Sequence, residues 1–284
     1  MSAAGLSLVL VAAFCHAFWN FLVKRLNAGP ELVWLFSVLS MLIYLPFVIW
    51  FAASMPVPGL VECLAILGSA TIHLGYFLLL QAGYRTGDLS LVYPVARATG
   101  PILSTAFAVL ILGENLSVMT GLGGAIIITG VLCLTGGGGG GKRILTSLGF
   151  GLAVGVLIGS YTVLDAWAVS ALMIPPIILD YFSSVGRVVI LAPLAYRRRV
   201  AVRILWRDRW RAVLGIAIFS PLAYILVLFA LTFTPVIYVA PLRESSVLIT
   251  VMLGSFLLGE GQITRRLFWA LVILTGVAVL AVSS

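Results

Sequence analysis

A succession of ten long apolar runs constrains this chain more than any other feature of its sequence. The runs are Gly5–Leu22, Leu32–Phe51, Val61–Leu80, Leu89–Leu112, Val118–Thr135, Leu145–Val169, Pro176–Tyr196, Ala212–Thr232, Val236–Leu258 and Leu267–Val282. In a helix, about 20 apolar residues cross a hydrocarbon core of about 30 Å, and the helix satisfies its own backbone hydrogen bonds there. The sequence therefore predicts an all-α integral membrane protein with ten transmembrane helices. The hydrophobic share of 62% and the charged share of 9% agree with this prediction.

The fourth run is repeated in the ninth, 146 residues later. Residues 93–114 read YPVARATGPILSTAFAVLILGE and residues 239–260 read VAPLRESSVLITVMLGSFLLGE, so that Arg97 aligns with Arg243 and both copies end in Leu-Gly-Glu. A charged residue inside a membrane span costs about 2.5–3.5 kcal/mol on insertion scales. Because the chain carries this cost twice at matching places, we expect its working centre where the two copies meet.

A glycine-rich stretch divides the ten runs into five and five. It occupies residues 136–143, and its composition is typical of a flexible linker. Because five is odd, the second half must enter the membrane from the opposite side to the first. The sequence thus predicts two inverted five-helix repeats, residues 1–135 and 144–284, around a central cavity, which is a common architecture of secondary transporters.

The glycine-rich stretch also matches part of a phosphate-binding loop. Arg143 follows Lys142 where that motif has Ser or Thr, and no strand precedes the glycines. We therefore interpret the stretch as a linker and expect no nucleotide, metal or other cofactor. The three cysteines are scattered and show neither a disulfide framework nor metal-ligand spacing.

Lysine and arginine are distributed unevenly between the two sets of loops. Fourteen of the 17 Lys and Arg residues lie in loops that follow odd-numbered runs, and positive residues favour the cytoplasmic side. We therefore expect those loops in the cytoplasm and both termini outside, in the periplasm. The richest loop, residues 196–211, reads YRRRVAVRILWRDRWR. Its tryptophans and its place between two runs favour an amphipathic segment at anionic headgroups over a nucleic-acid patch.

Glycines in the sixth run predict a close contact between helices. Gly151, Gly155 and Gly159 recur every four residues and therefore lie on one face of a helix. In lipid, such a face allows a neighbouring helix to approach closely.

Polar, ionisable and aromatic side chains within the runs form the candidate site, because such groups usually face the bundle interior or a water-filled cavity. On the first run, His16, Trp19 and Asn20 are three and four residues apart and therefore form a stripe along one face of the helix. Asp165 and Glu244 are candidates for proton coupling, and the Tyr161 hydroxyl is expected to hydrogen-bond the Asp165 carboxyl one helical turn away. The candidate substrate-binding residues are Trp19, Asn20, His73, Tyr76, Tyr93, Arg97, Tyr161, Tyr224 and Arg243.

The two arginines have more than one possible role. A guanidinium in the site can bind a carboxylate or phosphate with two hydrogen bonds. Alternatively, the arginines hold the two repeats together by hydrogen-bonding to backbone carbonyls or acidic side chains. In a third possibility, their side chains extend to the membrane–water interface. Pro101 leaves the carbonyl of Arg97 without its helical donor, which provides one such acceptor.

These features resemble a known family. Ten runs, two repeats and a Pro-x-x-Arg…Leu-Gly-Glu stretch near the end of each repeat are similar to the drug/metabolite transporter superfamily, EamA type, and most of all to bacterial amino-acid and metabolite exporters of the YddG kind. In the second copy, Pro241 lies one residue nearer to its arginine than Pro94 does in the first. The resemblance implies a basket of ten helices with a cavity between the halves and alternating access, in which helices 1, 3, 4, 6, 8 and 9 line the cavity.

The leading hypothesis is an inner-membrane secondary transporter, acting as a monomer in the lipid bilayer, that exports small metabolites and above all amino acids. A second hypothesis changes the substrate to a phosphorylated or otherwise anionic metabolite. A membrane enzyme acting on lipid would need a nucleophile–base pair, and a His–Ser or His–Asp contact would favour it. A non-transporting assembly partner would have a core without a cavity. Nucleic acid is not an expected partner.

Overall fold

The computed structural model describes residues 2–26, 28–53, 56–86, 89–135, 144–246, 248–249 and 263–282. Within them the chain is helical, with these elements: α1 Ala3–Leu26, α2 Pro30–Ala53, α3 Leu60–Thr86, α4 Leu89–Ile111, α5 Val118–Thr135, α6 Ile144–Ser170, α7 Pro176–Arg197, α8 Arg199–Leu231, α9 Val236–Arg243 and α11 Ile263–Val282. The predicted linker and the end of the ninth run, with Glu260, lie outside the described residues.

The prediction of an all-helical membrane protein is confirmed. Six of the described helices, α1, α2, α3, α6, α7 and α8, are long and apolar enough to cross a membrane. Shorter apolar stretches occupy Val95–Ile111 in α4 and Val118–Cys133 in α5. The count of ten spans stays a prediction.

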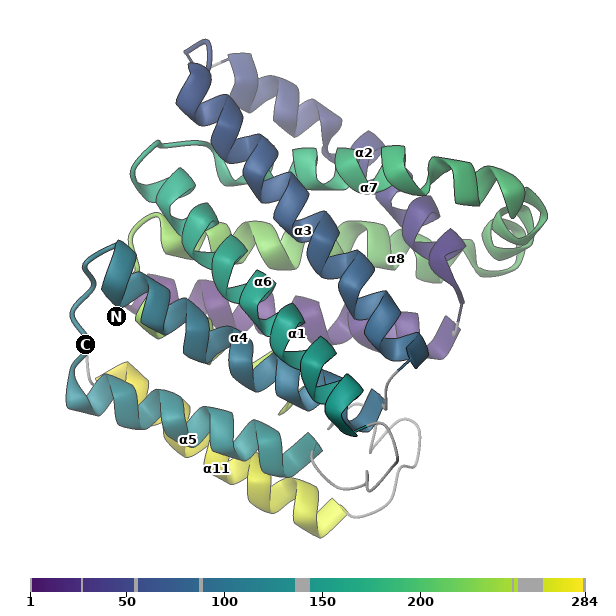
Figure 1. Ribbon diagram of the computed structural model, residues 1–284. Helices are drawn as coiled ribbons and strands as arrows, with labels where there is room; N and C mark the ends of the chain where they lie inside the picture. The colour runs from purple at the N-terminus through teal and green to yellow at the C-terminus, as the bar shows by residue number, and fades with distance from the viewer. Residues whose placement is uncertain are drawn as a thin grey trace.

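Successive helices run alternately from one end of the molecule to the other, with different tilts (Figure 1). The first residues of α1 and the last residues of α11 lie at the same end of the bundle, on the left of the view. The connection between α7 and α8 lies at the opposite end, on the right. The arginine-rich stretch is therefore at the far end of the molecule from the described ends of the chain.

The helices of the two halves interlace. In the first half, α3 packs against α6 and α7; in the second half, α8 packs against α1 and α2. The most extensive contact joins α4 to α6, and further contacts join α2 to α7 and α5 to α11. Most of the large helix contacts therefore run between the halves.

Glycines allow the close contact of α6 with α4, as the sequence predicts. A Cβ atom on Gly155 would stand 2.5 Å from Thr99 Cβ, and one on Gly151 would stand 2.7 Å from Val95 Cβ. Real Cβ atoms do not approach so closely, so only glycine fits these positions. The predicted glycine face is thus confirmed, and it fixes the position of α6 beside α4.

A proline in α8 explains how α2 is attached to that helix. Pro221 has no N–H group, so the carbonyl of Ala217 lacks its usual helical donor. The Ser40 hydroxyl donates to Ala217 O at 2.8 Å, and the Tyr44 hydroxyl donates to Ile218 O at 2.7 Å. Side chains of α2 thus satisfy the backbone of α8 at its weakest point.

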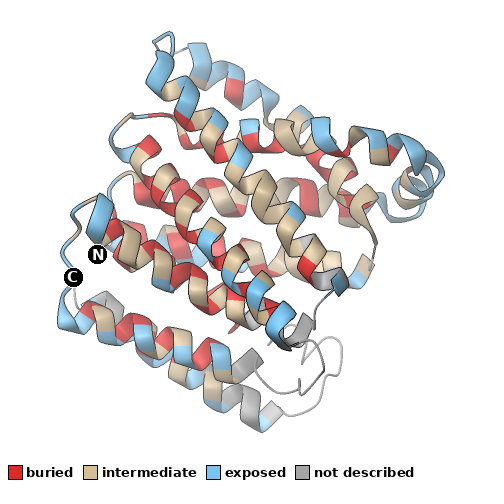
Figure 2. Cartoon of the chain, viewed as in Figure 1, coloured by how far each residue is buried: buried red, intermediate tan, exposed pale blue. Residues whose placement is uncertain are grey.

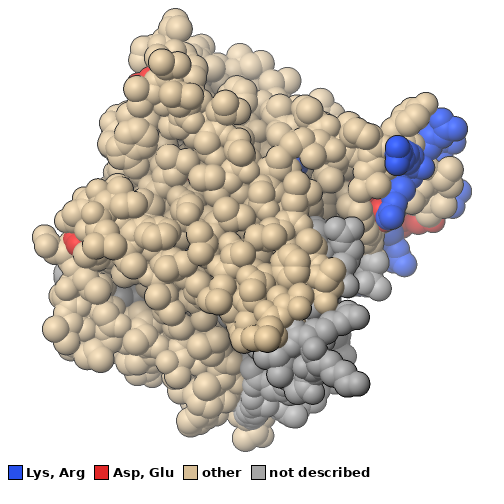
Figure 3. All heavy atoms as spheres, in the orientation of Figure 1, with Lys and Arg blue, Asp and Glu red and all other residues tan. Residues whose placement is uncertain are grey.

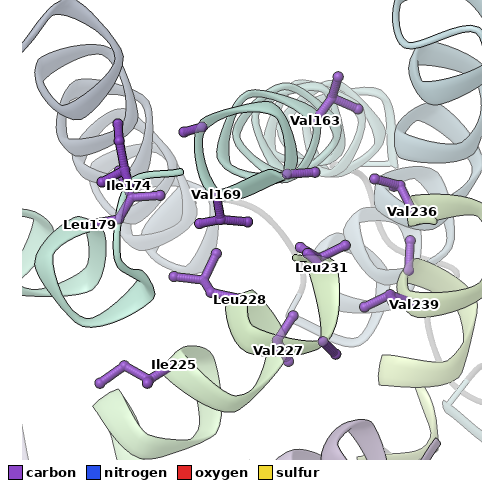
Figure 4. Close-up of a cluster of buried hydrophobic side chains, with 14 of the residues drawn as sticks. Val163, Val169, Ile174, Leu179, Ile225, Val227, Leu228, Leu231, Val236 and Val239 are labelled. Atoms are coloured by element: carbon purple, nitrogen blue, oxygen red, sulfur yellow. The ribbon is translucent and has the colours of Figure 1, made fainter. Parts of the chain in front are cut away.

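Burial follows the sides of the helices that face one another (Figure 2). The largest buried apolar cluster lies where α6, α7, α8 and α9 meet, and Figure 4 shows Val169, Leu228 and Leu231 converging in it. Outward-facing positions also carry large apolar residues, such as Trp50, which is 75% exposed. Apolar side chains on both sides of a helix are expected when one side faces lipid.

Candidate functional site

A buried carboxylate joins three helices in the middle of the bundle. Asp165, on α6, is fully buried. His73 Nε2, on α3, lies 2.9 Å from Asp165 Oδ2, and the Tyr224 hydroxyl, on α8, donates to the same oxygen at 2.5 Å. Two polar groups from other helices thus provide hydrogen-bond partners for a carboxyl group that would be costly to bury without them.

The expected bond between Tyr161 and Asp165 is not among the hydrogen bonds of the described residues, and that prediction was wrong about the partner. The Tyr161 ring stacks on the His73 imidazole, with centroids 4.0 Å apart and planes at 26°. Stacking holds the phenol against α3, so the donor to the carboxylate comes from Tyr224 instead. Tyr76 adds an edge-on contact to Tyr161 at 5.8 Å, which completes an aromatic wall beside the carboxylate.

A second cluster of polar side chains, around Arg97, connects the two halves of the chain. Its guanidinium Nη1 lies 3.4 Å from Glu244 Oε1, and Nη2 donates to His16 Nε2 at 2.9 Å. Arg97 belongs to α4, His16 to α1, and Glu244 is the residue that caps the end of α9. The ion pair therefore crosses between the first and second halves.

Arg243 links the two polar groups. Its guanidinium carbon lies 5.5 Å from the centroid of the Tyr224 ring, which is a cation–π distance. Glu244, the next residue, belongs to the Arg97 group. The two clusters are joined only by the adjacent residues Arg243 and Glu244 at the end of α9, and together they bring polar side chains from α1, α3, α4, α6, α8 and α9 into one set, which we call the polar chain. These are the six helices from which the sequence analysis draws the lining of the site.

Two acceptors in this chain of contacts have no donor among the described residues. They are Asp165 Oδ1 and Glu244 Oε2, and both atoms are buried. A buried polar atom without a partner costs about 1–3 kcal/mol, and more when it is charged. His73 and Arg97 nonetheless keep 15% and 18% of their side-chain surface accessible, although they lie between helices. An arrangement of this kind can receive a proton, a water molecule or a polar ligand.

The other predicted site residues lie at varying distances from this chain of contacts. The Trp19 ring meets the His16 ring edge-on at 5.1 Å, and the Asn20 amide donates to the backbone carbonyl of His16 at 2.7 Å. The side chain of Tyr93 lies outside the described part of the molecule. His16, absent from the predicted binding set, contacts Arg97 directly; its stripe with Trp19 was the available signal.

Sequence reasoning also missed the role of Glu114. Its two carboxylate oxygens accept hydrogen bonds from the backbone N–H groups of Val236 and Ile237, at 2.8 and 2.9 Å. These are first-turn donors of α9, whose preceding residue, Pro235, offers no side-chain cap. A carboxylate at a helix N-terminus satisfies free donors and complements the helix dipole. Glu114, just beyond the end of α4, therefore fixes where α9 begins, and the shared Leu-Gly-Glu ending was the signal.

Two cavities outside the polar chain are mostly apolar. One of about 680 Å³ lies between α4, α5 and α9, next to Pro241, and one of about 440 Å³ lies between α4 and α6, next to Trp167. Neither is lined by a predicted site residue. They offer no charge for recognising a polar solute.

The His73–Asp165 contact is one of the pairs that would favour an enzyme. A catalytic pair also needs a nucleophile that donates to the histidine. In the part of the chain that the structure describes, the partners of His73 are Asp165 and the rings of Tyr161 and Tyr224, with no serine, threonine or cysteine. The geometry therefore supplies an acid–base pair without a nucleophile.

Two stretches of the chain, residues 3–136 and 145–282, each match the EamA-like transporter family. A solved crystal structure has the same fold with a TM-score of 0.75; the match covers 99% of this chain and 98% of that chain at 14% sequence identity. At this identity the likeness shows the fold alone. No curated protein matches the sequence.

Proposed function

Because the chain belongs to the EamA-like transporter family, we propose that it is a secondary transporter that exports small metabolites, above all amino acids, across the inner membrane by alternating access. The observation that carries this proposal is the chain of polar contacts that connects six helices and both halves of the sequence. Ionisable groups at such a place are expensive in a membrane and usually serve a solute or ion pathway.

The proposed architecture is a pair of inverted five-helix repeats, residues 1–135 and 144–284, joined by residues 136–143 around a central cavity. The reciprocal packing of α3 on α6 and α7, and of α8 on α1 and α2, supports it. A two-fold axis between the halves would map the contacts of α3 with α6 and α7 onto the contacts of α8 with α1 and α2. The position of the described chain ends, opposite the arginine-rich connection, supports termini on the periplasmic side (Figure 1).

For an amino acid, the proposed site offers partners of both signs. Arg243 has no ion pair among the described residues, so its guanidinium is available for a substrate carboxylate. Asp165 Oδ1 is available for an ammonium group, and the aromatic wall of Tyr76 and Tyr161 lies beside this carboxylate, where the apolar part of a substrate would pack. We propose that the protein works as a monomer and handles substrates like those of the bacterial amino-acid and metabolite exporters of the YddG kind, which its sequence resembles.

The second candidate is a transporter of phosphorylated or other strongly anionic metabolites. Such a substrate is best held by two arginines together. The pairing of Arg97 with Glu244 already neutralises one of the two, which favours a substrate with a single carboxylate. The anionic alternative requires the Arg97–Glu244 pair to open when the substrate binds.

Proton coupling is part of the proposal, with Asp165 and Glu244 as the candidate groups. Glu244 lies against a guanidinium, whereas the direct partners of Asp165 are an imidazole and a phenol. A carboxylate between groups that can themselves exchange protons suits a proton pathway.

The test is flux in proteoliposomes. Purified protein is reconstituted, and efflux of labelled amino acids and of organic phosphates is followed with and without a pH gradient. We expect saturable efflux of at least one amino acid, unchanged by Arg25→Ala, which removes an exposed arginine outside the polar chain. Flux of phosphates alone would replace the lead substrate class, and no flux of either class by correctly inserted protein would contradict the proposal.

A further inference from the structure

The connection between α7 and α8 is longer than a membrane crossing requires. We call residues 196–211 the basic hairpin. Helix α8 contains 33 residues and is interrupted at Arg209, where φ is −136° and ψ is 19°. Since about 20 helical residues cross a hydrocarbon core, the part of α8 that precedes Arg209 forms a separate helical section beyond the span. This section lies at the right-hand end of the molecule in Figure 1.

The basic hairpin carries a concentrated charge that the protein does not neutralise. Of its seven arginines, all exposed, Arg198 pairs with Glu31 at 3.0 Å and Arg207 pairs with Asp208 at 2.7 Å. The rest form no ion pair with described residues: Arg197, Arg199, Arg203, Arg209 and Arg211. Figure 3 shows the blue basic atoms gathered at one edge of a face that otherwise carries few charged residues.

The outward side of this helical section is apolar as well as basic. Val202 and Leu205 pack inward on a buried cluster between α1, α2 and α8. Val200 and Ile204 point away from it and are 67% and 48% exposed, and Arg203 lies one helical turn from Val200. Trp206 and Trp210 are 42% and 44% exposed. Arginine, tryptophan and aliphatic side chains on one surface are typical of segments at a lipid–water interface.

From these observations we propose that the basic hairpin is a binding site for anionic phospholipid headgroups of the bilayer in which the protein lies. The guanidiniums of Arg199 and Arg203 bind headgroup phosphates, while Val200 and Ile204 enter the acyl boundary beside them. The hairpin joins two membrane-crossing helices directly, so a bilayer surface is always within its reach. The exposed aliphatic residues distinguish this surface from a nucleic-acid patch, because binding to a phosphate backbone depends on positive charge and not on aliphatic side chains.

Thermal unfolding of the full chain in nanodiscs tests this site. We expect a higher melting temperature in nanodiscs that contain phosphatidylglycerol than in nanodiscs of phosphatidylcholine alone, with a difference that falls as salt is added. Arg199→Gln with Arg203→Gln should remove most of the difference and weaken retention of phosphatidylglycerol roughly 10- to 30-fold, without changing the melting temperature in phosphatidylcholine. Arg199→Lys with Arg203→Lys is the matched control that keeps the charge and should keep most of the difference. Arg25→Gln, outside the hairpin, should also keep most of it.

A second measurement locates the hairpin independently of stability. A nitroxide at Ile204→Cys, in a chain whose native cysteines are replaced by serine, should be accessible to oxygen and shielded from a water-soluble relaxation agent in phosphatidylglycerol bilayers. A label that stays fully accessible to the water-soluble agent would overturn the proposal, as would an undiminished lipid-dependent shift in the double glutamine variant. Binding of RNA with no preference between the two lipids would replace the membrane with a nucleic-acid partner. These outcomes do not depend on which solute is transported.

Discussion

At the scale of single residues, Asp165 has the most informative surroundings in the bundle. One carboxylate oxygen contacts His73 Nε2 and accepts a hydrogen bond from the Tyr224 hydroxyl. The other oxygen is buried and has no donor among the described residues. Asp180, on α7, is near enough to interact with it electrostatically. Among the described residues, the titratable groups near Asp165 include His73, Tyr161, Asp180 and Tyr224, and Arg243 lies against the Tyr224 ring.

Asp165→Asn separates proton coupling from folding. The amide keeps the shape of the carboxyl group and can still accept from Tyr224, but it cannot take up or release a proton at physiological pH. We expect a folded protein in which a pH gradient no longer stimulates flux, while exchange of substrate across the membrane continues. Stimulation of normal size in this variant would exclude Asp165 as the coupling group, and Glu244→Gln then becomes the variant to measure.

Removing each arginine of the repeat should have a different effect. Arg97→Ala leaves the buried Glu244 carboxylate without its ion pair, which typically costs 3–5 kcal/mol of stability. Arg243→Ala breaks no ion pair of the described residues, and it should instead raise the half-saturation concentration for a carboxylate substrate about 10- to 100-fold. Insertion into the membrane should persist in both variants.

Melting curves and substrate titrations distinguish the two roles of these arginines. If Arg97 only locks the halves together, removing Glu244 as well should restore stability and flux. Normal flux in both single variants would remove the arginines from the site.

At the scale of the helix, Glu114 shows how one side chain positions a whole element. Its carboxylate supplies acceptors to two first-turn N–H groups of α9, and α9 carries Arg243 and ends at Glu244. Glu114→Ala should lower the free energy of unfolding by about 1–2 kcal/mol, as the loss of a helix cap typically does. Glu114→Gln keeps one acceptor oxygen and should lose about half as much. Equal stability of all three proteins in a denaturant titration would show that α9 does not depend on this cap.

The glycine face of α6 allows a test with a control on the same helix. Gly155→Ala places a methyl group where Thr99 already lies and should destabilise the protein by about 1–3 kcal/mol. Gly149→Ala meets no atom within 4 Å among the described residues and should be neutral or slightly stabilising, because alanine favours helix. If the two variants melt at the same temperature, the contact of α6 with α4 is looser than the structure implies.

At the scale of the whole molecule, the sequence predicts the helices and the close approach of α6 to a neighbour, because apolar length and glycine spacing are local properties. It does not predict the partners of individual polar side chains. Tyr161 is one turn from Asp165, yet Tyr224, 59 residues away, makes the bond. Which hydroxyl reaches a carboxylate depends on how α3, α6 and α8 pack together, and no pattern within one run encodes that. For the same reason, the stripe with Trp19 and the shared Leu-Gly-Glu ending draw attention to His16 and Glu114 but do not identify the groups that these residues contact.

The sidedness of the molecule can be measured with single cysteines. We expect Ser2→Cys to react with an impermeant reagent added outside the cell, and Ala201→Cys to react only after the membrane is permeabilised. Ser2 immediately precedes α1 and Ala201 lies near the start of α8, and these two helix starts are at opposite ends of the bundle (Figure 1). Both cysteine variants are made in a chain in which Cys63, whose side chain is exposed, has been replaced by serine. Labelling of both positions from outside would contradict the proposed topology.

The interlaced packing of α1 with α8 and of α6 with α3 and α4 has an implication for the origin of the chain. Among the described helices, α1 packs mainly on α8 of the second half, and α6 packs mainly on α3 and α4 of the first half. A half expressed alone therefore lacks the helices against which its own first helix packs. Under the proposed architecture of inverted repeats, a five-helix ancestor needed a second copy in the opposite orientation to pack against, and gene fusion then joined the two copies. Separately expressed halves of this protein should therefore recover activity only when both are made in the same cell.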